Sequence, residues 1–256
     1  MRTIAVLNQK GGVGKTTTVA NVAAALALNG QRVLVMDLDP QAHLTIHLGA
    51  DRDAGGGAYD VLVRDVPLDE AVREVRPNLW LLGANIDLVG AESELVSVVG
   101  REIILREALE AVREQFDYVL IDCPPSLGLL TLNALVASDT VLIPIQAEYY
   151  ALEGLGHLLH TIALVRQSLN ASLEIEGILL TMVDVRTNLA QQVESEVRAH
   201  FQELAFQTVI PRNVRLSESP SFGKAVLLYD RTSTGSQAYV TLAHEFCRRQ
   251  GCPVAA

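Results

Sequence analysis

Short apolar runs recur along the chain and alternate with longer stretches that have the composition of helices. The runs consist mainly of valine, leucine, isoleucine and alanine, as is typical of strands that are buried on both faces of a parallel sheet. The runs predicted to form strands are residues 3–8, 32–40, 78–84, 117–125, 139–145, 173–183 and 206–211.

The stretches between these runs predict helices. One starts at Lys15, is rich in alanine and leucine, and meets a natural helix stop at Gly30. Residues 102–115 predict a second helix, and Gly154 and Gly235 lie near the starts of two later ones.

The pattern is weakest between residues 51 and 100, where residues 53–62 predict a loop that enters a short helix. Elsewhere strands alternate with helices of about 10 to 15 residues, an order that predicts parallel βαβ units in one sheet. The sequence shows no repeat, low-complexity tract or linker. The expected fold is α/β, with a single doubly wound, mostly parallel sheet flanked by helices in one domain over residues 1–256.

A glycine-rich loop follows the first apolar run. Residues 8–18 read NQKGGVGKTTT, which departs from the phosphate-binding pattern G-x-x-x-x-G-K-[ST] because Gln9 takes the place of its first glycine. Gly11, Gly12 and Gly14 still allow the backbone to curl so that successive N–H groups point at phosphate oxygens. The positive end of the following helix adds to this attraction.

Lys15 and Thr16 stand where that helix begins. Lys15 can reach the β- and γ-phosphates of a nucleotide, and the Thr16 hydroxyl can bind Mg²⁺. A plain glycine turn followed by an exposed lysine is the alternative, and the order of strand, loop and helix argues against it. The residues predicted to bind nucleotide here are Gln9, Lys10, Gly11, Gly12, Val13, Gly14, Lys15, Thr16 and Thr17.

Three aspartates come at the ends of predicted strands. Asp122 stands where a carboxylate holds Mg²⁺, often through water. Asp37 and Asp39 are two residues apart and would lie on the same side of an extended chain. Because the carboxyl ends of parallel strands border the ligand crevice, we expect all three near the glycine loop. Capping of a turn is the alternative for any one of them.

The composition indicates the cellular environment of the protein. No run of about 18 apolar residues occurs, so no segment is expected to span a membrane. Cys123, Cys247 and Cys252 lack the paired spacing of metal sites or disulfide frameworks. A reduced, cytoplasmic environment is expected.

The net charge of −10 argues against a general nucleic-acid binder, but the charge is unevenly distributed. Residues 51–122 hold 16 acidic and seven basic residues, whereas residues 181–256 hold seven acidic and eight basic ones. A local basic face in the C-terminal third therefore remains possible. Lysine occurs only at Lys10, Lys15 and Lys224, so two of three lysines lie in one loop.

These motifs resemble a known family. KGGVGKTT is similar to the deviant Walker A box of the ParA/MinD family, a branch of the P-loop NTPases marked by an extra lysine at the position of Lys10. DLDPQAHLT and DYVLIDCPPSLGLLTLNAL resemble the segments that follow it. IPIQAEYYALEGL, TMVDVRTNLAQQV and VIPRNVRLSESPSFGKAVLLYDRTSTGSQAYVTLAHE resemble the chromosomal ParA (Soj) branch. The match covers almost the whole chain and is loosest over residues 48–101.

The resemblance implies roles for several residues around a bound nucleotide. Lys10 would reach across a nucleotide-sandwich dimer to the phosphates held by the other subunit. Asp39 would orient the attacking water, Asp37 would support Mg²⁺ indirectly, and Asp122 would be the Walker B acid. The segment that lines the adenine in this family contains, in this sequence, Pro211 and Asn213.

The resemblance also implies contacts with DNA. Arg186 and Arg215 match family arginines that contact DNA, and Lys224 and Arg231 are weaker candidates that an ordinary solvated surface explains as well. Ala42 and His43 replace the usual Gly-Asn, and Ser219 replaces a commoner alanine; these departures bear on the rate of hydrolysis.

The expected function is ATP-driven partition of chromosomal or plasmid DNA, with ATP and Mg²⁺ as cofactors. The ATP-bound homodimer would bind double-stranded DNA without sequence preference, and a ParB-type centromere-binding protein would stimulate hydrolysis and release it. The protein would be cytoplasmic and nucleoid-associated. A MinD-like positioning ATPase at a membrane is the first alternative, and it needs an amphipathic C-terminal helix. A metal-cluster carrier is the second, and it needs a ligating cysteine pair.

Overall fold

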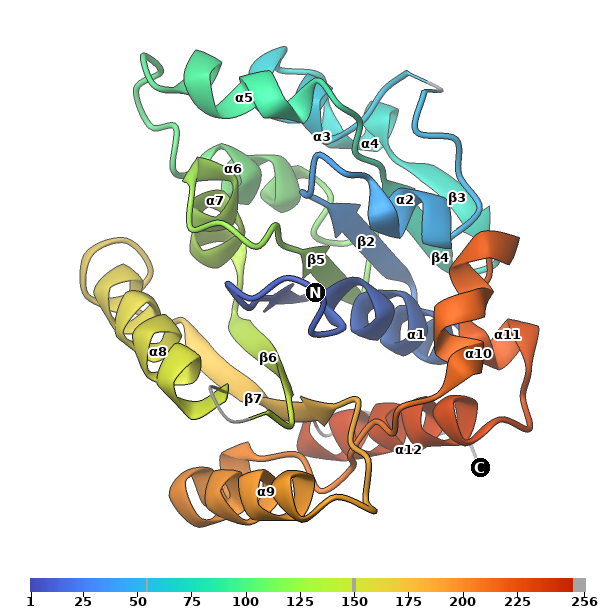
Figure 1. Cartoon of the computed structure of the whole chain (residues 1–256). Helices are drawn as coiled ribbons and strands as arrows, with labels where there is room; N and C mark the ends of the chain where they lie inside the picture. The colour runs from blue at the N-terminus through green and yellow to red at the C-terminus, as the bar shows by residue number, and fades with distance from the viewer. Residues whose placement is uncertain (54, 149–150, 251–256) are drawn as a thin grey trace.

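A seven-stranded sheet forms the centre of the molecule in the computed structural model, which describes residues 1–53, 55–148 and 151–250 (Figure 1). The strands lie in the order β3-β4-β2-β5-β1-β6-β7. Their bounds are β1 Arg2–Val6, β2 Val33–Asp37, β3 Arg73–Arg76, β4 Leu79–Leu82, β5 Tyr118–Asp122, β6 Thr140–Gln146 and β7 Glu174–Thr181.

The sheet is parallel except at one edge. Each neighbouring pair of strands runs parallel, apart from β3, which pairs antiparallel with β4. From β1 the order extends through β5, β2 and β4 on one side and through β6 and β7 on the other, so the chain winds in both directions. The predicted doubly wound, mostly parallel sheet is confirmed.

Helices cover both faces of the sheet. In Figure 1, α1 and α12 lie on one face, and α6, α7 and α8 lie on the other. The helices are α1 Lys15–Leu28, α2 His43–His47, α3 Ala58–Val63, α4 Leu68–Ala71, α5 Leu88–Leu95, α6 Ile104–Ala111, α7 Leu129–Ala137, α8 Ala151–Ser168, α9 Asn188–Phe201, α10 Val214–Glu218, α11 Val226–Tyr229 and α12 Thr234–Gln250, with 3₁₀ turns η1 Gln202–Leu204 and η2 Ser219–Phe222.

The alternation of β1 explains why both faces are apolar. Ile4 and Val6 belong to the core shared with α1 and α12, whereas Ala5 and Leu7 belong to the core on the opposite face. Successive side chains of a strand point to opposite faces, so a strand buried on both sides is continuously hydrophobic.

The strand predicted at residues 206–211 is wrong. This segment forms only isolated bridges beside β7 and the turn after it. The amide groups of Gln207 and Thr208 donate hydrogen bonds of 2.8 Å to the Glu245 carboxylate instead of to a neighbouring strand. A side chain from α12 therefore takes the backbone donors that a continuous ladder would need.

Other boundaries differ less. The helix predicted over residues 102–115 is the shorter α6, and the helix placed near Gly154 begins at Ala151. The edge strand β3 was not predicted, because three of the four residues in its sequence REVR are charged and it lacks an apolar face. The short helix expected within 53–62 is confirmed as α3.

Candidate nucleotide site

The loop between β1 and α1 has the shape that phosphate binding needs. Gly12 and Gly14 adopt the left-handed φ angles of 75° and 89°, and Gly14 directly precedes α1. An added Cβ at Gly11 or Gly12 would meet no atom within 4 Å, so space lies next to this backbone. Thr181, at the end of β7, holds the loop by donating a 2.8 Å hydrogen bond to the carbonyl of Val13.

Lys15, Thr16 and Asp122 meet at the first turn of α1. Lys15 is only 7% exposed, and its ammonium donates to the carbonyl of Lys10 at 3.2 Å. Burial lowers the pKa of Lys15, an effect that the nearby carboxylates of Asp122 and Asp39 partly oppose. The hydroxyl of Thr16 donates to Oδ2 of Asp122 at 2.7 Å. The structure thus brings Lys15, Thr16 and Asp122 together at the start of α1.

This geometry fits a magnesium ion. The Oδ1 atom of Asp122 is buried and has no hydrogen-bond partner among the described residues, next to the Thr16 hydroxyl. Burial, with the nearby charge of Asp37, raises the pKa of Asp122 well above its ordinary value. Such a buried carboxyl is stable as a carboxylate only beside a cation, and Mg²⁺ commonly takes one or two protein ligands beside phosphates and water. The described residues contain no cluster of three or more His, Cys, Asp or Glu side chains that could hold a metal by themselves.

Asp37 and Asp39 have different surroundings despite their spacing. Asp37 is fully buried, and its Oδ2 accepts hydrogen bonds from the backbone and hydroxyl of Thr45, at 2.9 and 2.7 Å. Burial raises the pKa of Asp37 to about 6, although the hydrogen bonds from Thr45 act in the opposite direction. Asp39 is half-buried, lines the cavity of the glycine loop, and accepts from the amide of Gln41 at 3.0 Å.

Lys10 points away from its own phosphate loop. Its ammonium pairs with the Glu148 carboxylate, and the two side chains are 53% and 45% exposed. Lys10 is absent from the walls of the adjoining cavity, whereas Lys15 and Thr16 line it. Gln9 is exposed as well. The two lysines of the loop therefore have different surroundings, because Lys15 lines the cavity and Lys10 lies outside it.

Two neighbouring cavities lie along the loop. One of about 500 Å³ runs between the glycines, Asp39 and His43. The other, of about 230 Å³, contains Pro211 and Asn213, the residues predicted beside the adenine. The two share the wall residues Gly14, Thr17, Met182 and Pro220. The predicted phosphate and adenine residues thus line two neighbouring cavities.

Two residues near these cavities, Met182 and Thr45, were not predicted from the sequence. Met182 follows β7 with a φ of 52°, and it borders both cavities. Thr45 links Asp37 to the amide of Ala84, which donates to the Thr45 hydroxyl at 2.9 Å. Thr45 stands in the quoted DLDPQAHLT segment, but its partner lies 39 residues further on. Only the folded chain shows this connection.

The departures from the family pattern gather near this region. Ala42 has a left-handed φ of 55° and is fully buried, a conformation that glycine adopts without steric cost. His43 lines the larger cavity. Ser219 is fully buried, and its hydroxyl has no partner among the described residues. His47, at the end of α2, is also buried, which lowers its pKa to about 4.

The arginines predicted to contact DNA already have acidic partners. Arg186 pairs with Asp184 at 2.7 Å, and this pairing lowers the pKa of Asp184 to about 2. Arg215 pairs with Glu218 at 2.8 Å and with Asp230 at 3.3 Å. Both arginines are exposed, and each follows one of the two residues, Val183 and Pro211, that form a bridge after β7.

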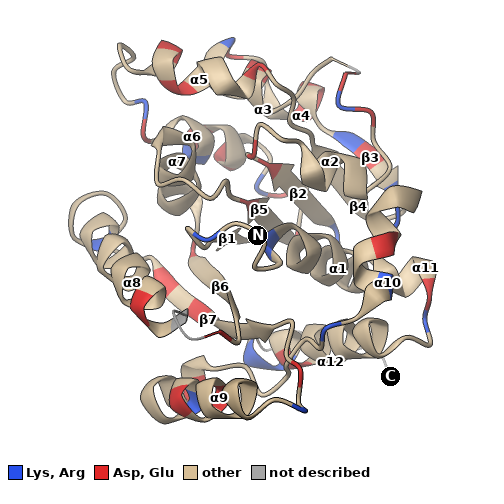
Figure 2. Cartoon of the chain, in the orientation of Figure 1, with Lys and Arg blue, Asp and Glu red and all other residues tan. Residues whose placement is uncertain are grey.

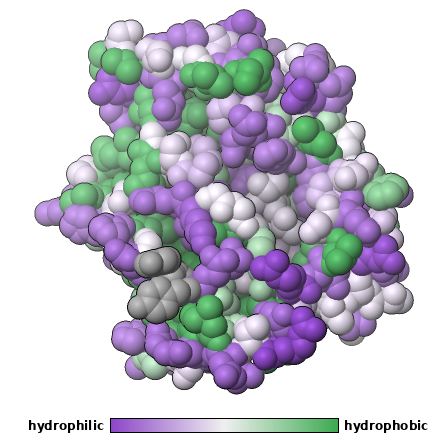
Figure 3. Space-filling model, viewed as in Figure 1, coloured by the Kyte–Doolittle hydropathy of each residue, from purple (hydrophilic) through white to green (hydrophobic). Residues whose placement is uncertain are grey.

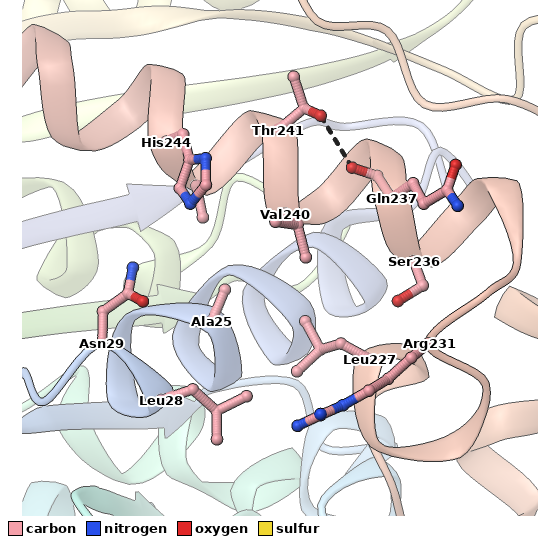
Figure 4. A pocket seen from close by; sticks show the side chains of 11 residues that line it. Ala25, Leu28, Asn29, Leu227, Arg231, Ser236, Gln237, Val240, Thr241 and His244 are labelled. Carbon is pink, nitrogen blue, oxygen red and sulfur yellow. Dashed lines mark hydrogen bonds between the residues drawn. The ribbon is translucent and has the colours of Figure 1, made fainter. Parts of the chain in front are cut away.

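A further cavity of about 560 Å³ lies at the other end of α1, between that helix and α12 (Figure 4). Arg231 lies on its wall and extends toward Leu28. The 14-residue α1 separates it from the glycine loop by about 20 Å. This position separates Arg231, one of the weaker DNA candidates, from the nucleotide cavities.

The two alternative functions, a metal-cluster carrier and a MinD-like ATPase at a membrane, can be compared with the described residues. Cys123 is buried beside Asp122, and burial raises its thiol pKa; Cys247 is buried in α12, and Cys252 lies outside the described residues. Among the described helices none combines the length and apolar character that crossing a bilayer requires. The end of the chain, where a membrane-binding segment of the MinD type is expected, includes residues 251–256, which also lie outside the described residues.

Comparisons with known proteins show the family to which the chain belongs. A family model described as an AAA domain matches residues 1–175. The chain is 54% identical over 244 residues to the sporulation initiation inhibitor protein Soj of Bacillus subtilis, which covers 94% of this chain and 96% of that protein. The chain belongs to the Soj/ParA family. It is also 52% identical to the chromosome partitioning protein ParA of Myxococcus xanthus, over 97% of this chain and 88% of the relative.

Solved structures support the assignment of this Soj/ParA chain to the P-loop fold. A structure called cobyrinic acid a,c-diamide synthase, from Mycobacterium smegmatis with bound ADP and magnesium, has a TM-score of 0.85 and 41% identity. It covers 100% of this chain and 99% of its own. Its name denotes a different activity from those of the Soj and ParA relatives, which are more similar in sequence.

Proposed function

We propose that this protein is a Mg²⁺-dependent ATPase that partitions chromosomal or plasmid DNA through an ATP-bound homodimer. The observation that carries the proposal is the different environment of the two loop lysines. Lys15 is buried beside its own phosphate site, whereas the exposed Lys10 lies outside it and can face a nucleotide on a second subunit.

The residues of one subunit would bind and orient the nucleotide. Backbone N–H groups of the glycine loop and Lys15 hold the phosphates, and the Pro211 segment borders the adenine. Thr16 and Asp122 would hold Mg²⁺, which neutralises charge on the phosphates during transfer. Asp39 would hold a water in line with the γ-phosphate, and Asp37 would fix the loop through Thr45.

Lys10 would couple the nucleotide to dimerisation. In the single chain its charge is compensated by Glu148. A facing nucleotide carries several negative charges and offers stronger charge-assisted hydrogen bonds than an exposed carboxylate does. Because ATP would then belong to the interface, its hydrolysis would weaken the dimer.

DNA binding would follow from the same dimer. Each subunit supplies few phosphate contacts, and Arg186 and Arg215 must first leave their acidic neighbours. Two subunits held by ATP double these contacts on one surface at a high effective concentration. A ParB-type partner would then release the DNA by stimulating hydrolysis.

A salt titration of DNA binding tests this proposal. The protein is titrated onto two duplexes of unrelated sequence, once with a non-hydrolysable ATP analogue and once with ADP. We expect equal affinity for both duplexes, binding only with the analogue, and a slope of about 0.9 per neutralised phosphate in log affinity against log salt. Equal binding with ADP would contradict the ATP-dimer switch.

Variants of the arginine surface sharpen this test. Arg215→Glu should weaken binding to both duplexes, and Arg186→Ala should do so more mildly. Glu218→Gln removes an acidic partner of Arg215 and should strengthen binding. Arg166→Glu, an exposed arginine on α8, is the matched control. Arg215→Glu binding like Arg166→Glu would show that the DNA surface lies elsewhere.

A further inference from the structure

A groove lies among the helices that follow β2, away from the phosphate loop. Its walls come from α3, the turn at residues 65–67, α4, the end of α5 with Val98, and α6. Its volume of about 710 Å³ exceeds the values of about 500 and 230 Å³ for the two nucleotide cavities. A space of this size can accept the side chains of a macromolecular partner.

The lining of this groove contains two kinds of residue. The polar ones are all carboxylates, namely Asp65, Asp69, Glu94 and Glu107. The rest are valine, leucine, isoleucine, alanine or proline, and no lysine or arginine takes part. An apolar floor with a rim of one charge has a defined complement, which is a ligand with both apolar and cationic groups.

The carboxylates of the rim remain available. All four residues are exposed, and none forms an ion pair within the described parts of the chain. Glu94 accepts a hydrogen bond from the hydroxyl of Tyr59 at 3.0 Å. The neighbouring Arg64 instead pairs with Asp60, at 2.7 Å, and lies over the Tyr59 ring.

Apolar surface is exposed at the same end of the molecule. Val98, in the groove, is 41% exposed, and Val96 just outside it is 62% exposed. Figure 3 shows hydrophobic surface where Figure 1 places α5, and Figure 2 shows acidic segments on the side of α3 to α5. Asp65 has a left-handed φ of 56°, a conformation that aspartate tolerates better than most residues, so the turn itself places a carboxylate at the rim.

We propose that this groove docks a cationic amphipathic helix of a partner protein. Apolar side chains of one helix face would enter the groove between α3 and α6, and lysine or arginine side chains beside them would meet the four carboxylates. A groove between helices is a common receptor for such a segment, with anchors spaced three and four residues apart. The four carboxylates belong to residues 51–122, which carry a net charge of −9 in a chain of −10, so the whole segment would attract a cationic partner.

The test uses two synthetic peptides and the full chain. The amphipathic peptide has about 14 residues, or about four helical turns, with leucine on one face and lysine on the other. The charge-only peptide has the same lysines, and glutamine replaces leucine. Each carries a fluorescent label, and anisotropy gives its affinity at low and at physiological salt, where charge attraction alone is strongly screened.

The variants separate the groove from general charge. Asp69→Lys with Glu107→Lys reverses two rim residues on α4 and α6. Glu70→Lys with Glu110→Lys makes the same change of charge on the same two helices, at residues that do not line the groove. Val98→Ser removes apolar floor without a change of charge. Binding of an ATP analogue and the unfolding transition confirm that each variant is folded.

The amphipathic peptide should bind the unaltered protein at least about tenfold more tightly than the charge-only peptide at physiological salt. The rim double variant should lose about tenfold or more in affinity, the control double variant less than about threefold, and Val98→Ser should weaken only the amphipathic peptide. Equal loss in both double variants, equal binding of both peptides, or no binding of either would overturn the proposal.

Discussion

The nucleotide edge of the sheet and the groove among α3 to α6 both concentrate charge, but they hold it in opposite ways. Asp37, Asp122 and Lys15 are at most 7% exposed and contact residues from distant strands or loops. The carboxylates of the groove are exposed and lie on short helices and a turn. The first region fixes charge inside the protein, whereas the second leaves it in water.

This difference determines which charges can do chemistry. Removal from water raises the pKa of Asp37 to about 6 and lowers that of Lys15, so both groups respond strongly to a cation or a phosphate placed beside them. Exposed carboxylates are hydrated and screened by salt, so each contributes little alone and they act on a partner as a group. Positions at the nucleotide edge should therefore tolerate substitution poorly, and the rim of the groove should tolerate it well.

The largest expected effect is that of Lys15→Ala. The phosphates lose their main fixed positive charge, and the nucleotide affinity should fall about a hundredfold or more. Calorimetric titration with an ATP analogue and Mg²⁺ measures this change. Affinity within about threefold of the unaltered protein would place the phosphates outside the glycine loop.

Asp39→Ala should lower ATP hydrolysis about a hundredfold and leave binding of Mg-ATP nearly unchanged, because the residue would position water rather than nucleotide. The expected product is a trapped dimer that stays on DNA. Phosphate release and analogue binding are measured on the same sample. Unchanged turnover would remove Asp39 from the reaction and make Asp37 the next candidate.

Asp37→Asn tests how the ionisation of a buried carboxyl group changes the free energy of unfolding. Because the folded pKa of Asp37 is raised from 3.8 to about 6, its contribution to stability is full below pH 3.8 and is lost as the pH rises through about 6. The stability of the nucleotide-free protein relative to Asp37→Asn should thus fall by a few kcal/mol, on the order of 3, between pH 4 and pH 7. Urea unfolding at both pH values gives this difference, and parallel behaviour of the two proteins would contradict the raised pKa.

The smallest effect is expected at the groove. Asp69→Lys with Glu107→Lys should change the free energy of unfolding by less than about 1 kcal/mol, since both residues are exposed and unpaired among the described residues. Binding of the ATP analogue should stay unchanged. A loss of more than about 2 kcal/mol would show that these carboxylates support the fold rather than face solvent.

The sequence could place the residues of the nucleotide edge near one another because each belongs to a local motif. Gly11 to Thr17 form one continuous strand-loop-helix motif, and Asp37 and Asp122 each end an apolar run. The carboxyl ends of parallel strands lie at the same edge of a sheet, so the pattern of strands alone brings these aspartates together. In the structure Asp37 stands in register with Asp122. Most of the alternation of strands and helices was predicted for the same reason, although β3 was missed and residues 206–211 form no strand.

What the sequence did not show depends on contacts between distant segments. The Glu245 carboxylate of α12 accepts backbone hydrogen bonds from residues 206–211, which therefore form no strand. Glu148, 138 positions from Lys10, balances the charge of that lysine. The groove appears only when α3 packs beside α6. Neither apolar periodicity nor a motif specifies such pairings, so the acidic excess of residues 51–122 could be counted but not located on a surface.

The central claim, that ATP joins two subunits through Lys10, is tested most directly by sedimentation. The unaltered protein, Lys10→Ala and the control Lys224→Ala are compared with a non-hydrolysable ATP analogue and with ADP, at matched nucleotide saturation. We predict dimers of the unaltered protein and Lys224→Ala with the analogue only, and monomers of Lys10→Ala with either nucleotide despite normal analogue binding. A Lys10→Ala protein that dimerises like the unaltered one would contradict the account.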